Sequence, residues 1–322
     1  MANRIDWETQ IGRRLRLRDL HALFTVVQCG SMAKAAGQLG VSQPAVSKVV
    51  ADLEYALGVR LLDRTRRGVE PTIYGRALLK RGLVAFDELK QSIRDIEFLA
   101  DSKQGEVRIE CPESAAWTFL PALIERFSRT YPRVTLHVDT IVSPTLGLPA
   151  LRERKYDLIL GWLPQPLPDD FRADDLKVES LLDDRLAIAA GRHHHWARRR
   201  KIPLEELANE PWLMQAPSTW NYNRIAEVFR ERGLAVPDAS LVTLSSALRI
   251  HFLANGPFIT AMARSQVRRN GLSELAVDLP SWPFPFSVVT LENRTLSPVV
   301  EHFIENCRAE AKLMAGSVIG KA

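Results

Sequence analysis

The spacing of apolar residues is most regular between Ser31 and Leu62, where it predicts two short helices joined by a tight turn. Ser31 is a good N-cap for the first helix, and Gly40 ends that helix in the turn. The second helix begins directly behind Ser42, and its apolar residues recur at steps of four, three and four. These inward residues are Val46, Val50, Leu53 and Leu57. The pattern predicts a helix-turn-helix, in which the second helix enters the major groove of DNA.

The outward face of this second helix carries short polar or basic side chains and no acid before Asp52. Short polar groups at the start of such a helix can reach the edges of base pairs. This face is therefore the predicted DNA-reading surface, and its residues are Ser42, Gln43, Pro44, Ser47 and Lys48. After Gly58 the chain alternates and turns, which predicts a two-stranded wing with Arg64, Arg66 and Arg67 near its tip.

Short motifs occur at fixed spacing through residues 15–75. They are AA (Ala35, Ala36), SQPAVS (Ser42 to Ser47), LE (Leu53, Glu54), LG (Leu57, Gly58), LLDR (Leu61 to Arg64) and Thr72 with Gly75. This stretch closely resembles the N-terminal winged helix-turn-helix of the LysR-type transcriptional regulators, and a weaker resemblance continues to about residue 310. The resemblance implies that the three wing arginines contact phosphates or lie in the minor groove. A solvated charge run is the alternative interpretation of these arginines.

Residues 73–100 contain no proline, and their apolar positions recur with a mean step of 3.5 residues. Two helices that lie against each other require this repeat, so a dimerising linker helix is predicted. A helix packed on its own domain is the alternative. A dimer would present two DNA-reading helices to a near-palindromic site. The predicted seam consists of Leu79, Leu83, Phe86, Leu89, Ile93, Ile96 and Ala100.

Beyond a polar hinge at residues 101–105, strands alternate with helices, which predicts mostly parallel sheets with ligand sites at the C-terminal strand ends. Pro-rich segments at 163–173 and 280–285 predict two crossings between lobes. The fold class is thus α/β with an N-terminal winged helix-turn-helix, a long linker helix and a two-lobed Rossmann-like domain, similar to the LysR effector domain and to periplasmic binding proteins. The expected domains are the winged helix-turn-helix at 15–72, the linker helix at 73–100, lobe 1 at 106–162 and 283–315, and lobe 2 at 163–282.

The cleft between the lobes is the predicted ligand site, because strand ends and helix N-termini that suit an anion meet there. The resemblance places an effector-contacting hydroxyl at Ser114, but the neighbouring Glu113 would oppose a carboxylate ligand. Tryptophans near these edges would suit a sugar or an aromatic ring, although core packing explains most of them equally well. Taken singly, each candidate side chain in this region is more simply explained as a helix cap or a packing residue. The converging candidates are Ser114, Ser143, Thr145, Trp162, Gln215, Ser218, Thr219, Phe258 and Thr260.

The distribution of charge supports a polyanion-binding N-terminal part. Residues 1–80 hold 13 Lys and Arg against 7 Asp and Glu, whereas the remaining residues hold 30 against 31. The three cysteines have no C-x-x-C spacing, and the adjacent histidines at 193–195 cannot all face one ion, so neither a disulfide nor a metal site is expected. No apolar leader or membrane-spanning stretch is visible, which predicts a cytoplasmic protein.

The expected function is sequence-specific transcription regulation controlled by a small metabolite, a sugar or an aromatic compound. The expected partners are double-stranded operator DNA, the effector, further copies of the chain in a dimer and tetramer, and RNA polymerase, but not a membrane. No enzyme motif, catalytic residue or cofactor is expected. Two alternatives stay open: a small-molecule-binding protein without gene regulation, and a redox-sensing regulator.

Overall fold

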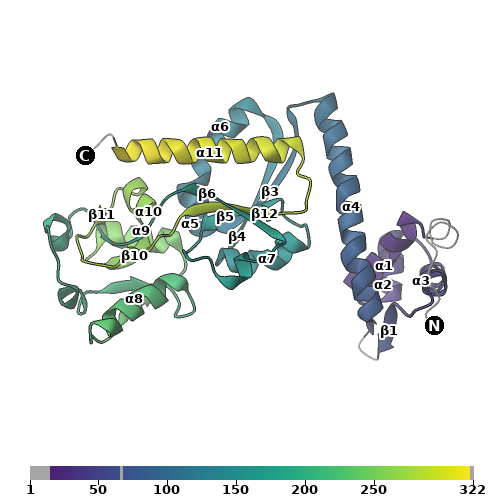
Figure 1. Ribbon diagram of the computed structural model, residues 1–322, viewed down its shortest axis with the longest axis horizontal. Coiled ribbons are helices and arrows are strands. Elements are labelled where there is room, and N and C mark those ends of the chain that lie inside the picture. The colour runs from purple at the N-terminus through teal and green to yellow at the C-terminus, as the bar shows by residue number, and fades with distance from the viewer. Residues whose placement is uncertain (1–14, 66–67, 320–322) are drawn as a thin grey trace. The chain divides into compact units, whose positions relative to one another are not determined.

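A computed structural model describes residues 15–65 and 68–319, apart from the side chains of residues 64, 65 and 316–319 (Figure 1). The chain divides into two compact units, Met1–Lys90 and Gln91–Ala322. Among the described residues, no helix is long and apolar enough to cross a membrane.

The first unit contains the predicted helix-turn-helix. Ser31 Oγ accepts a hydrogen bond from Lys34 N at 3.5 Å, and Ser42 Oγ accepts one from Ala45 N at 3.4 Å. Gly40 lies between the two helices with a φ of 66°, a left-handed conformation that costs glycine no strain. Both predicted caps and the predicted turn are therefore confirmed. The three helices are α1 (Leu17–Cys29), α2 (Met32–Leu39) and α3 (Gln43–Leu57).

An antiparallel wing follows, formed by β1 (Leu62–Thr65) and β2 (Gly68–Pro71). Glu54 Oε1 accepts hydrogen bonds from the backbone N–H groups of Leu61 and the next residue, at 2.7 and 3.1 Å. Thr72 Oγ1 accepts a hydrogen bond from Gly75 N at 3.0 Å. A Cβ atom at position 75 would overlap the carbonyl oxygen of Leu61, so this close approach requires glycine. The LE and Thr-x-x-Gly motifs thus anchor the wing to the helices.

The linker helix α4 (Ile73–Ala100) is one helix of 28 residues. In the middle of α4, Phe86 packs edge-on against Phe24, with ring centroids 5.5 Å apart. Further along, the side chains of Leu89, Ile93 and Ile96 are 44%, 57% and 66% exposed. The early part of the predicted seam therefore packs on its own domain, whereas the later part forms an exposed apolar strip.

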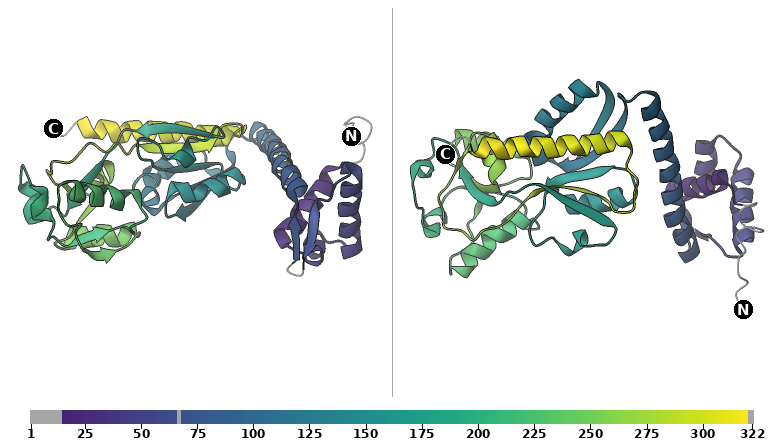
Figure 2. Two further views of the ribbon diagram at one scale, coloured as in Figure 1. Left: turned by 60° about the horizontal axis from the view of Figure 1, so that its bottom comes forward. Right: turned by 45° about the horizontal axis from the view of Figure 1, so that its top comes forward.

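The larger unit begins with a five-stranded sheet in the order β4-β3-β5-β12-β6, in which only β12 runs antiparallel to its neighbours. Helices α6 and α11 cover one face through a core that includes Phe119, Phe127 and Phe303, while α7 packs on the other face. Figure 2 shows α11 lying along this sheet. The elements are β3 (Gln104–Pro112), α5 (Glu113–Thr118), α6 (Leu120–Thr130), β4 (Arg133–Ile141), α7 (Pro144–Arg152), β5 (Leu158–Trp162), β6 (Leu176–Leu182), β12 (Phe286–Leu291) and α11 (Pro298–Ile319).

The second sheet has the order β11-β7-β10-β8-β9, and only β7 runs antiparallel to its neighbours. Trp212 and Phe229 form its core under α8, and Leu253 and Val267 pack from α9 and α10 on the other face. The elements are β7 (Leu186–Ala190), β8 (Trp212–Met214), α8 (Trp220–Glu231), β9 (Ala239–Val242), α9 (Ser246–Asn255), β10 (Ile259–Ala263), α10 (Arg264–Arg269) and β11 (Ser273–Glu274). Short 3-10 helices lie at Asp169–Phe171, His195–Arg198 and Leu204–Leu207.

The lobe boundary at 163 predicted from the sequence is wrong. Strand β6 joins the first sheet, where it pairs with β12 from Leu176 to Leu182. The Pro-rich segment 163–173 stays with this lobe, because Phe171 packs with Leu148 and Leu151 of α7. The chain instead crosses between the sheets at residues 183–185 and 275–285. The sequence shows that a strand forms there, but its distant pairing partner decides which sheet it joins.

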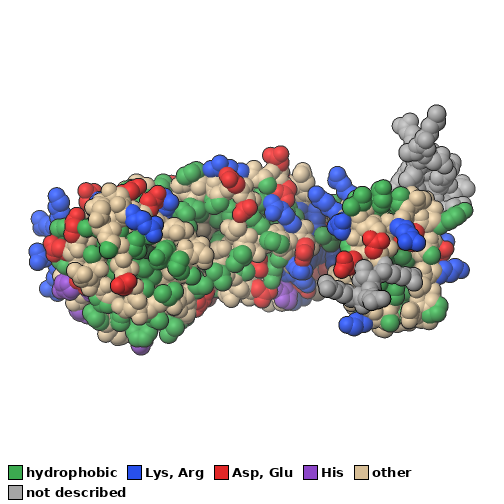
Figure 3. All heavy atoms as spheres, turned by 90° about the horizontal axis from the view of Figure 1, so that it is seen from below, with side chains coloured by type: hydrophobic (Ala, Val, Ile, Leu, Met, Phe, Trp, Pro, Cys, Tyr) green, Lys and Arg blue, Asp and Glu red, His purple; other side chains and the backbone are tan. Residues whose placement is uncertain are grey.

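The helical segment behind β3 is divided into two helices, since α5 ends at Thr118 and α6 starts at Leu120. Pro121 lies in the first turn of α6, where its missing N–H leaves no bond unmade. On the face of the molecule shown in Figure 3, acidic and basic side chains of the larger unit are interspersed with apolar ones. This agrees with the near-neutral charge of that part of the sequence.

Candidate DNA-binding surface and effector cavity

The outward face of α3 consists of accessible polar side chains. Gln43, Pro44 and Lys48 are exposed, and Ser47 is partly exposed. Ser42 is exposed too, although its hydroxyl oxygen already accepts the capping hydrogen bond. The opposite face is held inward because Val46, Val50 and Leu53 are buried in the helical core. The rotation of α3 about its axis is therefore set by packing, and the predicted reading face points outward.

The wing arginines are only partly described. Arg64 lies on β1 opposite Val69 of β2, while its side chain is among those not described. Arg66 and Arg67 lie outside the described residues. Contact between these three arginines and the DNA backbone stays a prediction.

A cavity of about 440 Å³ lies between the two sheets of the larger unit. It is bounded by the C-terminal ends of β3, β4, β5 and β8, which converge because these strands end toward the same cleft. Seven of the nine candidates line it: Ser114, Ser143, Thr145, Trp162, Gln215, Ser218 and Thr219. Thr219 also caps α8, since its Oγ1 accepts a hydrogen bond from Tyr222 N at 3.4 Å. The Ser143 hydroxyl makes no such cap bond at the start of α7.

The other two candidates, Phe258 and Thr260, do not line this cavity. β10 runs parallel to β8, so Phe258 precedes the start of β10 at the edge away from the cleft, where it packs on Phe252. Thr260 is 1% exposed, and its hydroxyl donates to Leu213 O at 2.6 Å. Both predictions are wrong because a strand's direction within the sheet decides which of its ends reaches the cleft.

Two tryptophans form part of the cavity wall. Trp220 stacks on Phe284, with ring centroids 4.7 Å apart and planes 19° from parallel. Trp162 is 5% exposed, and its Nε1 donates to Asp184 Oδ2 at 2.9 Å. Trp212 is buried in the second-lobe core, and Trp117 lies outside the cavity. The wall therefore offers aromatic faces to a ligand.

The sequence reasoning missed Arg249, which lines the cavity from α9. This residue is 2% exposed, and its Nε and Nη1 atoms have no hydrogen-bond partner among the described residues. Burial lowers the pKa of Arg249 to about 10, and the nearby Glu113 opposes the shift, so the guanidinium stays charged at neutral pH. The available signal was a single arginine in a mostly apolar helical stretch, SALRIHFLA, that contains no acidic residue.

Two family profiles match most of the chain. The profile of the LysR substrate binding domain matches residues 100–312, and that of the bacterial regulatory helix-turn-helix protein, lysR family, matches residues 17–76. The chain belongs to the LysR family. It is a LysR-type DNA-binding transcriptional regulator with a substrate-binding domain, and this family consists of transcriptional regulators, not enzymes.

This LysR-family regulator is 27% identical over 238 residues to the HTH-type transcriptional regulator TdcA of Escherichia coli, covering 74% of the chain and 73% of TdcA. Its fold is similar to that of a full-length OxyR variant from Pseudomonas aeruginosa (TM-score 0.60, 19% identity, 93% and 95% of the two chains). It is also similar to CbnR, a LysR family transcriptional regulator (TM-score 0.55, 20% identity, 92% and 99%).

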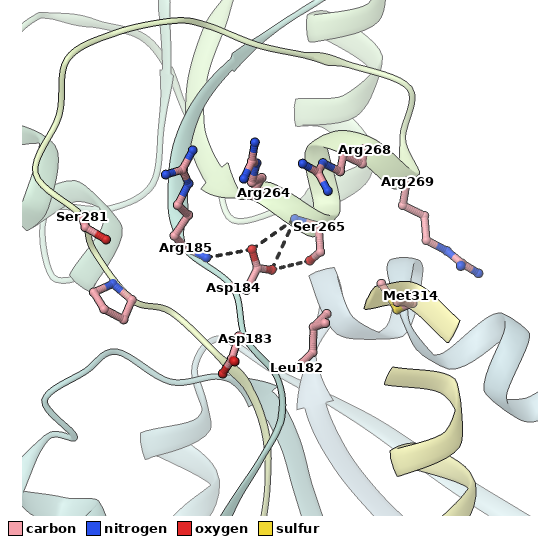
Figure 4. A pocket seen from close by; sticks show the side chains of 11 residues that line it. Leu182, Asp183, Asp184, Arg185, Arg264, Ser265, Arg268, Arg269, Ser281 and Met314 are labelled. Carbon is pink, nitrogen blue, oxygen red and sulfur yellow. Dashed lines mark hydrogen bonds between the residues drawn. The ribbon is translucent and has the colours of Figure 1, made fainter. Parts of the chain in front are cut away.

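A second hollow in the LysR-family chain, of about 940 Å³, lies beside the crossing segments (Figure 4). Asp184 stands at its centre and accepts hydrogen bonds from Ser265 Oγ and from Arg185 N, the latter at 2.8 Å. Because Asp184 also binds Trp162, it connects the wall of the first cavity to the start of α10. Four arginines line the hollow: Arg185 and Arg264, which both bind Glu274, and the exposed Arg268 and Arg269.

The histidine run of this regulator forms a cluster in which ligand atoms of His194, His195 and Glu210 lie within 4.8 Å of one another. His194 Nδ1 accepts a hydrogen bond from Trp196 N at 3.3 Å, which leaves the proton on Nε2, 3.2 Å from Pro257 O. Both ring nitrogens of His194 are therefore used within the protein. This leaves only His195 and Glu210 of the cluster as ligands, fewer than the three protein ligands that zinc sites use.

The cysteines of this regulator are inaccessible except for Cys29. Cys111 and Cys307 are fully buried, and burial raises the pKa of the Cys111 thiol to about 12 and that of Cys307 well above its ordinary value. Cys29 is partly buried, and its Sγ donates to Gln38 Oε1 at 3.1 Å. Only the thiolate reacts readily with oxidants, so the geometry does not favour a redox sensor.

In the native protein we expect a thiol-specific alkylating reagent to modify one cysteine, Cys29, and to modify all three only after unfolding. Mass spectrometry of the intact and digested protein would count and locate the modified residues. Cys29 lies outside the predicted DNA-reading face, so its oxidation should change the free energy of operator binding by no more than roughly 0.4 kcal/mol. Peroxide treatment is therefore expected to leave the operator affinity within about twofold. Rapid modification of Cys111 under native conditions would contradict this assignment.

Proposed function

We propose that this regulator binds a near-palindromic operator as a dimer, reads base edges with α3, and responds to a small organic molecule bound between its two lobes. The observation that carries the proposal is the outward polar face of α3, whose side chains are free of the packing that holds the rest of the helix. The cavity between the lobes supplies the place for the effector.

In this proposal each outward side chain of α3 makes the DNA contact that its chemical groups allow. The amide of Gln43 can donate to and accept from one base edge, as an adenine requires. Ser42 and Ser47 offer short hydroxyls, Pro44 offers an apolar contact for a thymine methyl group, and Lys48 offers a charge for a guanine or a phosphate. The wing arginines would hold the backbone on either side.

Dimerisation through α4 is supported by its exposed apolar strip. Leu89, Ile93 and Ile96 recur at steps of four and three, and each is at least 44% exposed. Apolar side chains at this spacing are buried when a second helix lies against them. A tetramer and a contact with RNA polymerase remain predictions.

The proposed effector site has the size and lining of a small-molecule site. Its volume of about 440 Å³ falls within the range of about 300 to 1,000 Å³ typical of such sites. Residues of both lobes line it, so a bound molecule can favour one relative arrangement of the lobes. The effector must bind one arrangement more tightly than the other, because equal binding to both changes nothing.

A footprint of the purified protein on the DNA upstream of its own gene tests the proposal. We expect protection of a near-palindrome that survives at the higher of two salt concentrations and that shortens or shifts when one compound of a metabolite panel is added. Protection no stronger than that of random DNA would contradict operator binding. Protection that no compound alters, together with no binding of any compound to the protein, would contradict the effector role.

A further inference from the structure

We propose that the effector is a small organic carboxylate with an apolar or aromatic body, and that its carboxylate pairs with Arg249. This inference rests on the interlobe cavity being the effector site, as proposed above. It adds the charge and the chemical class of the ligand.

The charge of the cavity is the first argument. Among the described residues that line it, Arg249 is the only charged one. No ion pair joins this arginine to any described carboxylate, and two of its guanidinium nitrogens have no hydrogen-bond partner. A buried charge is costly unless an opposite charge and hydrogen bonds compensate it. A neutral ligand would enclose this charge further, whereas a carboxylate would neutralise it.

From the sequence, Glu113 was expected to oppose a carboxylate ligand, but in the structure its own carboxylate group is engaged elsewhere. Its Oε2 accepts a hydrogen bond from Ser246 N at 2.8 Å, and its Oε1 accepts one from Ser245 Oγ at 3.4 Å. The carboxylate is thus engaged at the start of α9 and does not line the cavity. It lines an adjoining hollow together with Arg249, where it compensates part of the positive charge.

The remaining wall determines the body of the ligand. Trp162, Leu163, Phe171, Trp220 and Phe284 supply apolar or aromatic surface. Hydroxyls from both lobes stand between these side chains and can bind a substituent on the ligand. One positive charge within a largely apolar wall fits one carboxylate on an apolar body better than a polyanion or an uncharged sugar.

The second hollow is the competing place for an anion, because Arg268 and Arg269 are exposed there and form no ion pair with described residues. The two sites differ in their lining. Asp183 and Asp184 line the second hollow and compensate part of its positive charge, whereas among the described residues no acidic one lines the first cavity. Variants of the two arginine sets therefore separate the two sites.

The test compares the binding of carboxylates and their uncharged amides to the full-length protein: benzoate with benzamide, phenylacetate with phenylacetamide, and cyclohexanecarboxylate with its amide. Calorimetry and tryptophan fluorescence would measure the dissociation constants. We expect at least one acid to bind about tenfold more tightly than its amide, since a charged hydrogen-bonded pair contributes at least one factor of ten. Equal binding in every pair, or no binding of any acid, overturns the proposal.

Two variants locate the site. Arg249→Met should abolish the preference for the acid, while the double variant Arg268→Met, Arg269→Met should retain it. The opposite result places the anion in the second hollow and overturns the assignment. Without ligand, Arg249→Met should unfold at a temperature no lower than the parent protein, because it removes a buried charge that Glu113 compensates only in part. A clear loss of stability would instead show that Arg249 is a structural residue. Arg249→Lys keeps the charge and serves as the folding control.

The outcome also separates this inference from the proposed function. A footprint that shifts with a neutral compound, with equal binding of acids and amides, leaves the effector cavity in place and refutes only the carboxylate. If no compound binds the protein and no compound alters the footprint, both the carboxylate inference and the proposed effector role are refuted.

Discussion

Replacing Ile93 by Glu is expected to leave the protein monomeric and to lower its affinity for a palindromic operator at least about a hundredfold. Ile93 lies in the middle of the exposed strip of α4 and is 57% exposed in the single chain. A charge placed there would be buried against the partner helix, and burying an unpaired carboxylate is unfavourable. The monomer then binds one half-site at a time and loses the gain that comes from two linked half-sites.

Sedimentation and DNA-binding measurements on the same preparation would check this expectation. Leu99→Glu is the matched control, because Leu99 lies on the same helix, is 83% exposed and stands outside the predicted seam. This control should remain a dimer with nearly unchanged operator affinity. Neither substitution should destabilise the fold of the single chain by much, since both sites are exposed there. A dimeric Ile93→Glu protein would show that α4 is not the interface.

Replacing Gln43 by Ala is expected to weaken operator binding by about 1 to 3 kcal/mol, or roughly 10- to 150-fold, with little change on random DNA. Gln43 is exposed at the first turn of α3, so the substitution removes a donor and an acceptor without disturbing the core. Titrations on operator and on scrambled DNA, at matched salt, would measure the ratio. Equal losses on both sequences would refute a base-reading role.

Arg66→Ala is the contrasting variant for this experiment. Removal of one phosphate contact should weaken operator and random DNA alike and should reduce the slope of log affinity against log salt by about one. An unchanged slope would assign this arginine to the solvated surface. The two variants together separate sequence reading from backbone attraction.

The helix-turn-helix could be predicted closely because its signals are local. Caps at Ser31 and Ser42, a turn glycine at Gly40 and one apolar stripe define α2 and α3 within a few residues of each motif, and the structure confirms these elements. Helix formation and capping depend on residues three or four positions apart, so one stretch of sequence contains the whole argument. Even the LE and Thr-x-x-Gly motifs proved to be short-range anchors of the wing.

Other parts depended on contacts that the sequence does not contain. Strand β6 was assigned to the wrong lobe because its partner, β12, lies more than a hundred residues later in the chain. Phe258 and Thr260 were misplaced because the direction of β10 relative to β8 decides which strand end reaches the cleft. Seven cavity candidates did lie together, since the C-terminal ends of parallel strands meet at one edge.

By itself, the sequence of this protein determined the helix-turn-helix with its outward polar face, the linker helix and the two-lobed α/β class, because periodicity, caps and charge act over short distances along the chain. Only the tertiary structure decided where the lobes divide, which hydroxyls meet in one cavity, that Glu113 is engaged by α9, and that Arg249 is buried without a partner. Burial and pairing are properties of residues brought together from distant segments. For that reason the charge preference of the proposed effector site could be inferred only after the chain was folded.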